Sequence, residues 1–563
     1  MKVMLPGIVI LSSISALIFF AACSSQTVPP ADLVLTNGRI ATVDDSFSFS
    51  EAVAVNGDRI TKVGSAEEIA HYIGDETEVI DLEGKLTVPG LIDAHGHMLG
   101  YGNTLADIDF RGTESFEEII GMIKDYAETA PDGSWIFGRN WDQNDWPERE
   151  FPWHEKLSQA VPDHPVWITR VDGHAAITNA AGMKIAGITR DTKDPDGGEL
   201  LRKANGEPTG VFIDHAEWLV SKHIPDASQE QYRDRLALAS KNCLALGLTG
   251  VHDAGCSPAM IANYRSLIDN GSMGIRIFAM LSNPGKADVA DYLTKNRIDE
   301  YGGNMLKVTS IKLFMDGALG SRGGLLFEDY SDRPGYKGLA TLSYDDILNV
   351  SRAALKTGCQ VITHAIGDKA NKLTLDAYEV ALKENPKDDH RFRIEHAQVI
   401  APDNFGRFKP MGVIPSMQPT HATSDMYWAE DRLGPERIKG SYAIGKFLKE
   451  GNIVPCGSDF PVEKTNPMLG IYAAITRQDA KGFPEGGWFP EHRMNREQAL
   501  RGFTIWAAYA AFQEDILGSI EEGKLADFTV LSHDILTVEP KEILNTKALY
   551  TIVGGEIKYR VSD

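Results

Sequence analysis

Long apolar runs alternate with amphipathic segments through the middle of the chain. The runs that we predict to be buried strands cover residues 86–95, 247–254, 275–281, 307–315, 359–366, 391–398, 412–418 and 452–459. Helical periodicity lies between several of them, as in 229–246, 344–357 and 369–383. Strands that are apolar on both faces and are joined by helices favour a parallel sheet closed into a barrel. We therefore predict an α/β fold built on a TIM-like (β/α)8 barrel over residues 89–510.

The two ends of the chain and one internal stretch have a different pattern. Alternating positions with the hairpin signals Asn37-Gly38 and Asn56-Gly57 indicate strands within 31–88, and similar alternation returns within 511–563. We predict that these two segments together form a small β-sandwich. Residues 98–246, after the first barrel strand, are too many for an ordinary βα loop. We predict that they form an inserted subdomain at the mouth of the barrel.

The first residues have the composition of an export signal. Lys2 precedes an uncharged, mostly apolar stretch that reaches Ala22, and Phe20-Ala-Ala-Cys23 resembles a bacterial lipobox. We predict a lipoprotein-type signal at 1–22 and membrane tethering through lipidated Cys23, with the protein facing the periplasm or the cell exterior. The alternative is an uncleaved anchor helix, for which the apolar run is barely long enough. Cys359 and Cys456 lie in predicted interior strands and are expected to be buried free thiols.

Composition limits the partners. The 43% hydrophobic and 24% charged residues are ordinary for a globular protein. A formal net charge of −23 argues against nucleic acid or an anionic membrane surface as a binding partner. The expected partner is a small-molecule substrate, and a homo-oligomer stays open.

Metal-ligating residue types follow several of the predicted strands. His95 and His97 are two positions apart on an extended segment, so both imidazoles point to the same side. Four more candidates, each at a separate apolar run, are Lys312, His364, His396 and Asp459. Barrel enzymes place their catalytic groups at the carboxyl ends of the strands. The set predicts a metal-dependent hydrolase.

Lys312 lies within an apolar strand, where an ammonium group is costly unless it is paired or neutralised. One solution is a salt bridge with Asp316 or Glu395. The other is carboxylation by CO2, which gives a carbamate whose two oxygens can bridge two cations. Four histidines, an aspartate and a carbamate suit two divalent ions of the Zn, Mn or Fe type better than Mg or Ca.

These motifs resemble the amidohydrolase superfamily. The resemblance rests on residues 89–97, Lys312, Thr363-His364-Ala-Ile-Gly-Asp368, Ile394-Glu-His396-Ala-Gln and Gly457-Ser-Asp459-Phe-Pro-Val. The segments 312–322, 171–174 and 518–527 are similar to the amidohydrolase-3 group, which includes N-substituted formamide deformylases. The resemblance implies that His95, His97 and Asp459 bind one metal, His364 and His396 a second, and carboxylated Lys312 bridges them. It also implies that Asp459 is the catalytic acid–base residue, acting with a hydroxide held by the metals.

The function expected from this resemblance is hydrolysis of a carbon–nitrogen bond, other than a peptide bond, in a small amide, formamide or cyclic amide. The metal is expected to be two Zn ions, with Mn or Fe as alternatives. Ester or phosphoester hydrolysis on the same centre, or a non-catalytic binding lipoprotein, are the competing functions. Four further residues are candidates for substrate contact: His174, Asp316, Arg322 and His421.

Overall fold

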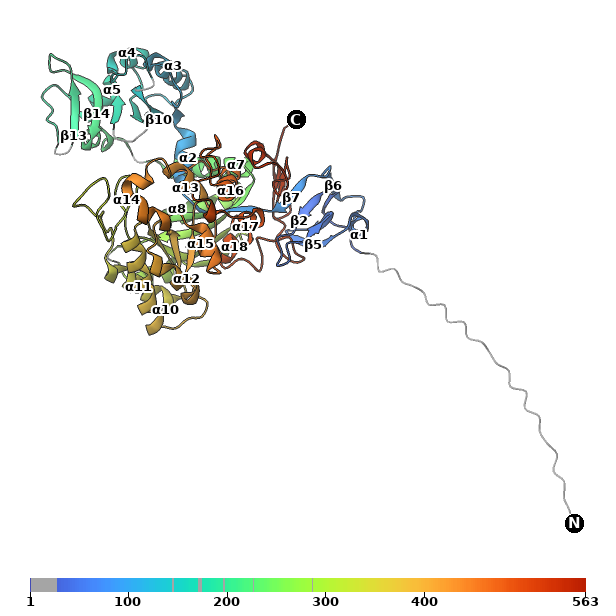
Figure 1. The fold of residues 1–563 in the computed structure, drawn as a ribbon. Helices are drawn as coiled ribbons and strands as arrows, with labels where there is room; N and C mark the ends of the chain where they lie inside the picture. The colour runs from blue at the N-terminus through green and yellow to red at the C-terminus, as the bar shows by residue number, and fades with distance from the viewer. Residues whose placement is uncertain are drawn as a thin grey trace.

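The computed structural model describes Met1 and residues 28–562, except 144–145, 171–174, 196–197, 226 and 286. The predicted signal at 1–22 and Cys23 lie outside the described residues, and so does His174. Figure 1 shows a central α/β body, a strand-rich region beside it that contains residues from both ends of the chain, and a separate lobe above the body. Among the described residues, no helix is long and apolar enough to cross a lipid bilayer.

The central body is a nearly closed barrel of seven parallel strands. In sheet order they are β8 (Leu91–Gly96), β15 (Leu248–Cys256), β16 (Arg276–Ser282), β18 (Leu306–Phe314), β19 (Gln360–Ala365), β20 (Arg393–His396) and β21 (Ile414–Ser416). Almost every residue in these strands is buried, because helices cover the outer face and side chains fill the interior. The predicted α/β barrel is therefore present.

The predicted helices between these strands are also present. They are α7 (Gln229–Ala245), α10 (Tyr344–Thr357) and α11 (Asp368–Glu384). Ser228 and Ser343 each cap a helix through a reciprocal capping box, which satisfies backbone N–H groups that the first turn leaves free. Gly358 ends α10 with φ 71°, a conformation that glycine adopts without strain.

Two of the predicted strand assignments are corrected by the structure. The run 86–95 is two strands in two sheets, β7 (Leu86–Pro89) and β8, with Gly90 at the bend. A Cβ atom on Gly90 would lie 2.1 Å from Thr249 Oγ1, so only glycine allows the chain to pass this close to β15.

The eighth predicted strand, 452–459, is not a regular strand. This segment takes the eighth place in the barrel through isolated bridges between Met417 and Cys456 and between Gly96 and Phe460. Asp459 has φ 61°, which is incompatible with a continuing β-ladder, although its N–H still donates to His95 O at 2.7 Å.

Strands from both ends of the chain share one sheet. Its order is β24 (Glu556–Arg560), β23 (Ala548–Val553), β22 (Phe528–Leu531), β7, β2 (Arg39–Ala41) and β3 (Phe49–Ser50). A second sheet contains β5 (Arg59–Gly64), β4 (Ala52–Asn56), β1 (Leu33–Thr36) and β6 (Glu78–Asp81). Apolar side chains of both sheets, among them Val53, Ile80, Phe528 and Ile552, belong to one buried cluster.

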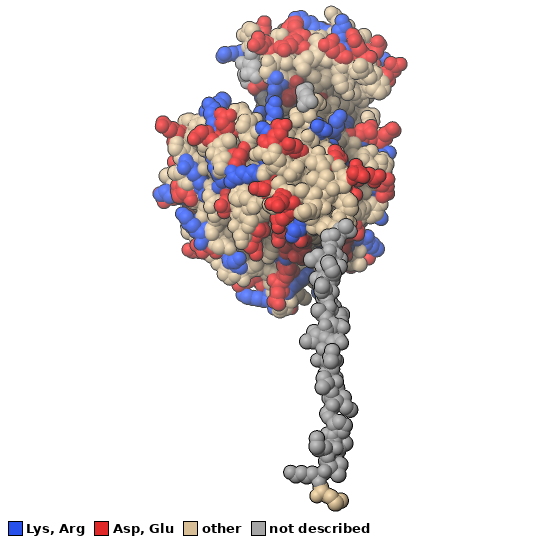
Figure 2. All heavy atoms as spheres, turned by 90° about the vertical axis from the view of Figure 1, so that its right-hand side faces the viewer, with Lys and Arg blue, Asp and Glu red and all other residues tan. Residues whose placement is uncertain are grey.

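The insertion after β8 forms its own lobe. After α2 (Met98–Ala106), its sheet has the order β13 (Gly198–Arg202), β14 (Pro208–Asp214), β12 (Ala175–Thr178), β11 (Val166–Arg170), β10 (Ile136–Trp141) and β9 (Ile108–Asp109). Trp141 and Trp146 are buried in the lobe's own hydrophobic cluster. Figure 2 shows the lobe above the barrel body, with acidic and basic side chains intermingled over the face in view rather than gathered by sign.

The four cysteines of the described residues, Cys243, Cys256, Cys359 and Cys456, are buried free thiols. This confirms the expectation for Cys359 and Cys456. Burial raises the pKa of Cys456, so its thiol is the stable form.

A buried ion pair ties the barrel to the sheet that both termini share. Arg276, the first residue of β16, donates from Nε and Nη2 to the two carboxylate oxygens of Asp527 at 2.7 and 2.9 Å. Asp527→Ala should lower the free energy of unfolding by about 3–5 kcal/mol, because it leaves the Arg276 guanidinium buried without a counter-charge. Denaturant midpoints measure the loss.

The control for this prediction is Asp291→Ala. Asp291 pairs with Lys295 on an exposed helix face, where a salt bridge contributes less than about 1 kcal/mol. Equal midpoints for the two variants would show that the Arg276–Asp527 pair adds no more to stability than a surface pair.

Candidate metal centre

The carboxyl ends of the barrel strands bring the six predicted metal ligands to one cavity of about 350 Å³. His95 and His97 stand at the end of β8 and just after it, and His396 ends β20. Lys312 and His364 come from β18 and β19, and Asp459 from the segment that closes the barrel. His421, from the first turn of α13 (Pro419–Asp425), lines the same cavity.

Asp459 lies among three imidazoles. Its Oδ1 is 3.2 Å from His97 Nε2 and 3.6 Å from His95 Nε2, and its Oδ2 is 3.6 Å from His421 Nε2. One ligand atom from each of His95, His396 and Asp459 lies within 4.8 Å of the others. Burial opposes ionisation of Asp459, but the hydrogen bond with His97 and the other nearby imidazoles hold its pKa well below the ordinary range. The carboxylate is therefore ionised at neutral pH.

The imidazoles are oriented by their outer nitrogens. His95 Nδ1 contacts Glu395 Oε2, His97 Nδ1 lies 3.0 Å from Ala254 O, and His396 Nδ1 lies 2.7 Å from Gln418 Oε1. A proton on Nδ1 donated to each oxygen leaves the Nε2 lone pair free toward the cavity, the usual arrangement of metal-binding histidines. Burial lowers the pKa of His396 to about 3, and that of His95 and His364 well below the ordinary value. These imidazoles are neutral, as metal ligation requires.

The donor set fits a divalent transition metal. Within the described part of the chain, the buried Nε2 atoms of His364 and His421 have no hydrogen-bond partner. Buried polar groups normally find a partner, so such unpartnered nitrogens indicate a ligand. Imidazole nitrogen with carboxylate oxygen suits Zn, Mn or Fe rather than Mg or Ca.

Lys312 is buried without a carboxylate partner. Its Nζ lies 3.3 Å from His95 Nε2 and 4.6 Å from the centre of the Phe314 ring. No carboxylate oxygen of the described residues lies within 4.0 Å of Nζ, so the salt bridge considered with Asp316 or Glu395 is not formed. Burial lowers the pKa of Lys312 to about 8, which makes its neutral, nucleophilic form accessible.

The backbone is strained at two of the candidate ligands. His396 has φ 70° and Asp459 has φ 61°, a region that non-glycine residues rarely adopt. Asp93 supports one of these turns, because its carboxylate accepts hydrogen bonds from His95 N and from the N and Oγ of Ser458. The β8 end and the segment with Asp459 are thus held together by a buried carboxylate.

Glu395 and Gln418 have positioning roles that sequence analysis missed. Glu395 is buried, accepts from Ser416 Oγ at 3.0 Å and pairs with Arg393 at 2.8 Å while it contacts His95. The position of Glu395, one residue before the candidate ligand His396, was a signal in the sequence that it lies near the site. Its contact with His95, 300 positions away, was not visible in the sequence.

Two of the predicted substrate-contacting residues are bound to other parts of the protein. Asp316 is buried, and its carboxylate accepts hydrogen bonds from the backbone N–H groups of Leu325, Ile366 and Gly367. Arg322 lies outside the cavity lining and donates to both oxygens of Asp332. In both cases the functional group is engaged by other residues of the protein, and neither residue lines this cavity.

The comparison with known proteins decides the family. The model of the amidohydrolase family matches residues 78–559, which is most of the chain. The chain belongs to the amidohydrolase family. The predicted resemblance is thereby confirmed.

This amidohydrolase has full-length relatives. It is 37% identical to Protein LONG AFTER FAR-RED 3 of Arabidopsis thaliana, with 96% of this chain and 94% of that protein covered. It is 28% identical to the N-substituted formamide deformylase of Arthrobacter pascens, with 94% and 98% covered. An uncharacterized metal-dependent hydrolase from Pyrococcus furiosus has a similar structure, with a TM-score of 0.74, 28% identity, and 90% and 100% of the two chains covered.

The rest of the amidohydrolase cavity is mainly apolar. Its wall contains Phe314, Leu319, Ile366, Trp428 and Val462. Lys312 is the only lysine or arginine that lines it within the described residues. A polar floor of candidate metal ligands beneath an apolar wall is suited to a small, mostly uncharged reacting group.

Proposed function

We propose that this amidohydrolase is a metal-dependent hydrolase that cleaves a carbon–nitrogen bond, other than a peptide bond, in a small amide, formamide or cyclic amide. The observation that carries the proposal is the convergence of neutral histidine nitrogens and the Asp459 carboxylate on one buried floor. The name of the Arthrobacter relative, which specifies N-substituted formamides, supports the same bond type. The absence of a second lysine or arginine among the lining residues that the structure describes argues against a phosphoester.

The same proposal assigns the ligands. His95, His97 and Asp459 would hold one ion, and His364 and His396 a second, with zinc as the expected metal. When bound, such ions polarise a carbonyl and make a water nucleophilic near neutral pH. Glu395, Ala254 O and Gln418 keep the imidazole Nε2 atoms turned to the cavity.

We also propose that Lys312 is carboxylated and bridges the two ions. In that step the neutral Nζ forms a bond to the carbon of CO2 and releases one proton, which leaves a carbamate anion. The buried position of Lys312 and its lack of a carboxylate partner among the described residues favour this chemistry over a bare ammonium.

Asp459 is proposed as the proton carrier. Asp459 lines the cavity and is ionised. Its carboxylate can therefore accept a proton from the attacking water and return it to the departing nitrogen.

A substrate panel tests the proposed function. Protein reconstituted with Zn, Mn or Fe(II) should hydrolyse a member of a set of N-formyl, N-acyl and cyclic amides, and a chelator should lower the rate at least about 100-fold. Matched esters and phosphoesters are the controls. Turnover of those controls but of no amide would contradict carbon–nitrogen specificity, and metal-loaded protein inactive on all of them would favour a binding role.

We propose, on the pattern of residues 1–23 alone, that the chain is exported and tethered to a membrane through lipidated Cys23. Unchanged membrane partitioning of a Cys23→Ala variant would contradict this.

We also propose that the two terminal sheets form a β-sandwich, because their apolar residues share one buried cluster.

A further inference from the structure

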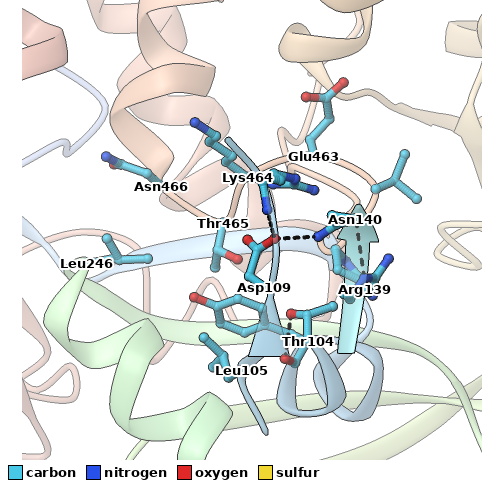
Figure 3. Close-up of a pocket in the computed structure, with 14 residues that line it drawn as sticks. Thr104, Leu105, Asp109, Arg139, Asn140, Leu246, Glu463, Lys464, Thr465 and Asn466 are labelled. Atoms are coloured by element: carbon cyan, nitrogen blue, oxygen red, sulfur yellow. Dashed lines mark hydrogen bonds between the residues drawn. The ribbon is translucent and has the colours of Figure 1, made fainter. Parts of the chain in front are cut away.

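A second cavity, of about 500 Å³, lies where the inserted lobe meets the barrel. One side is built by strands β9 and β10 of the lobe, with Asp109, Arg139 and Asn140, and by Arg111 just after β9. The other side is the segment 461–466, which directly follows Asp459. Figure 3 shows this segment, with Glu463, Lys464 and Thr465, over the strands that carry Asp109 and Arg139. Val462 and Glu463 also line the metal cavity, so the two cavities adjoin.

This cavity has free positive charge. Three cationic side chains line it, Arg111, Arg139 and Lys464, and none has a carboxylate within 4.0 Å in the part of the chain that the structure describes. Among the described residues, the side chain of Arg139 donates only from Nε to Asn140 Oδ1, at 3.4 Å. Elsewhere in the same lobe, Arg202 pairs with Asp194 at 2.9 Å.

Among the described residues, the carboxylates that line the cavity form no ion pair with these cations. Asp109 Oδ1 accepts from Asn140 Nδ2 at 2.8 Å and from the backbone N–H of Arg111 at 3.1 Å, as Figure 3 shows for Asn140. Glu463 forms no ion pair with the described residues. Asp109 therefore links β9 to β10 and does not pair with a guanidinium group of the described residues. The N–H donors of Arg139 and Lys464 remain available to a ligand.

A β-bulge sets the position of Arg139. The register of β10 against β11 shifts between Arg139 and Trp141, and the extra residue, Asn140, has φ 70° and is buried. Asparagine tolerates this conformation better than most residues, and a bulge redirects the side chains beside it. The hydrogen bond to Asp109 holds Asn140 in place. The orientation of Arg139 is thus a built feature of the lobe.

We propose that this cavity binds a carboxylate of the substrate, so that the substrate class is a small amide that carries a carboxylate away from the scissile bond. This inference rests on the proposed function, because it places the reacting amide at the adjoining metal centre. A planar guanidinium matches a carboxylate with two parallel hydrogen bonds, and the Lys464 ammonium adds a point charge. The acidic surface of the protein makes a bound anion elsewhere less favourable.

Anion binding by the full metal-loaded chain gives the first test. Isothermal titration with succinate should show binding that weakens at least about 10-fold in the double variant Arg139→Gln/Lys464→Gln, which loses two charged donors. The control is Arg190→Gln, because Arg190 is exposed on the same lobe and, in the part of the lobe that the structure describes, its side chain donates only to Asn205 O. Equal succinate affinity in the wild type and the double variant would overturn the proposal. Tighter binding of inorganic phosphate than of succinate, lost in the double variant, would also overturn it.

Paired substrates give the second test. For an amide acid, the double variant should raise KM about 10–100-fold with kcat within about two-fold, while KM for the methyl ester of the same amide stays unchanged. Equal effects on acid and ester would overturn the carboxylate assignment. If no amide is hydrolysed at all, the proposed function fails, and the titration with succinate still decides whether the cavity is an anion site.

Discussion

Asp459→Asn should lower kcat/KM for the best amide substrate by about 10³-fold, because it removes both a negative ligand and the proton carrier. The substitution keeps the size of the side chain, so the buried packing around it is preserved. Asp459 is the one carboxylate of the described residues within 4.0 Å of His97 and His421, and it also lies near His95. Steady-state kinetics measure the loss, and elemental analysis should show less bound metal.

Asp332→Asn is the matched control. Asp332 belongs to the region after β18 but lies outside the cavity lining, where it pairs with Arg322 and Arg432. The activity of the Asp332→Asn variant should stay within about two-fold of the wild type, since such surface pairs contribute little to stability. An Asp459→Asn enzyme with more than a tenth of the wild-type kcat/KM would show that Asp459 is not the proton carrier.

Lys312→Ala should lower kcat/KM by about 10²–10³-fold. It should also reduce bound metal by about one ion per chain, as expected when a bridging ligand is lost. Short carboxylic acids such as acetate or propionate should restore part of the activity, because they supply the two oxygens of the carbamate in the space that the side chain leaves. Native mass spectrometry of the wild type should show one added CO2.

Lys312→Met separates bridging from packing. Methionine keeps the apolar stem but fills the space, so this variant should be as inactive as Lys312→Ala and should not respond to added acids. Rescue of both variants, or of neither, would contradict a bridging carbamate at Lys312. A fully active wild type without CO2 on Lys312 would contradict it as well.

The class of fold could be predicted from the hydrophobic pattern, because parallel strands buried on both faces leave uninterrupted apolar runs. The apolar run over 86–95 did not reveal that Gly90 divides it between two sheets, since the division depends on the approach of Thr249. The segment 452–459 resembled the other strands in composition, but the left-handed conformation of Asp459 prevents a regular ladder there.

The candidate site, like the fold, could be predicted from the sequence only in part. Residue types and their places along the chain indicated His95, His97, Lys312, His364, His396 and Asp459, because each lies in or just after an apolar run and the carboxyl ends of barrel strands meet at one mouth. Asp316 and Arg322 do not line the metal cavity, which their nearness in sequence to Lys312 could not reveal, because it does not show where their side chains are engaged.

The sequence by itself therefore determined the barrel class and the family and indicated the candidate ligand residues, since these depend on local pattern and on motifs read along the chain. Only the tertiary structure decided which nitrogen of each histidine faces the cavity, through the contact of His95 with Glu395 and of His396 with Gln418. It also decided that Arg139 of the lobe and Lys464 of the barrel line one cavity. These pairings join residues far apart in sequence, and a side chain's direction depends on packing between elements that no local pattern encodes.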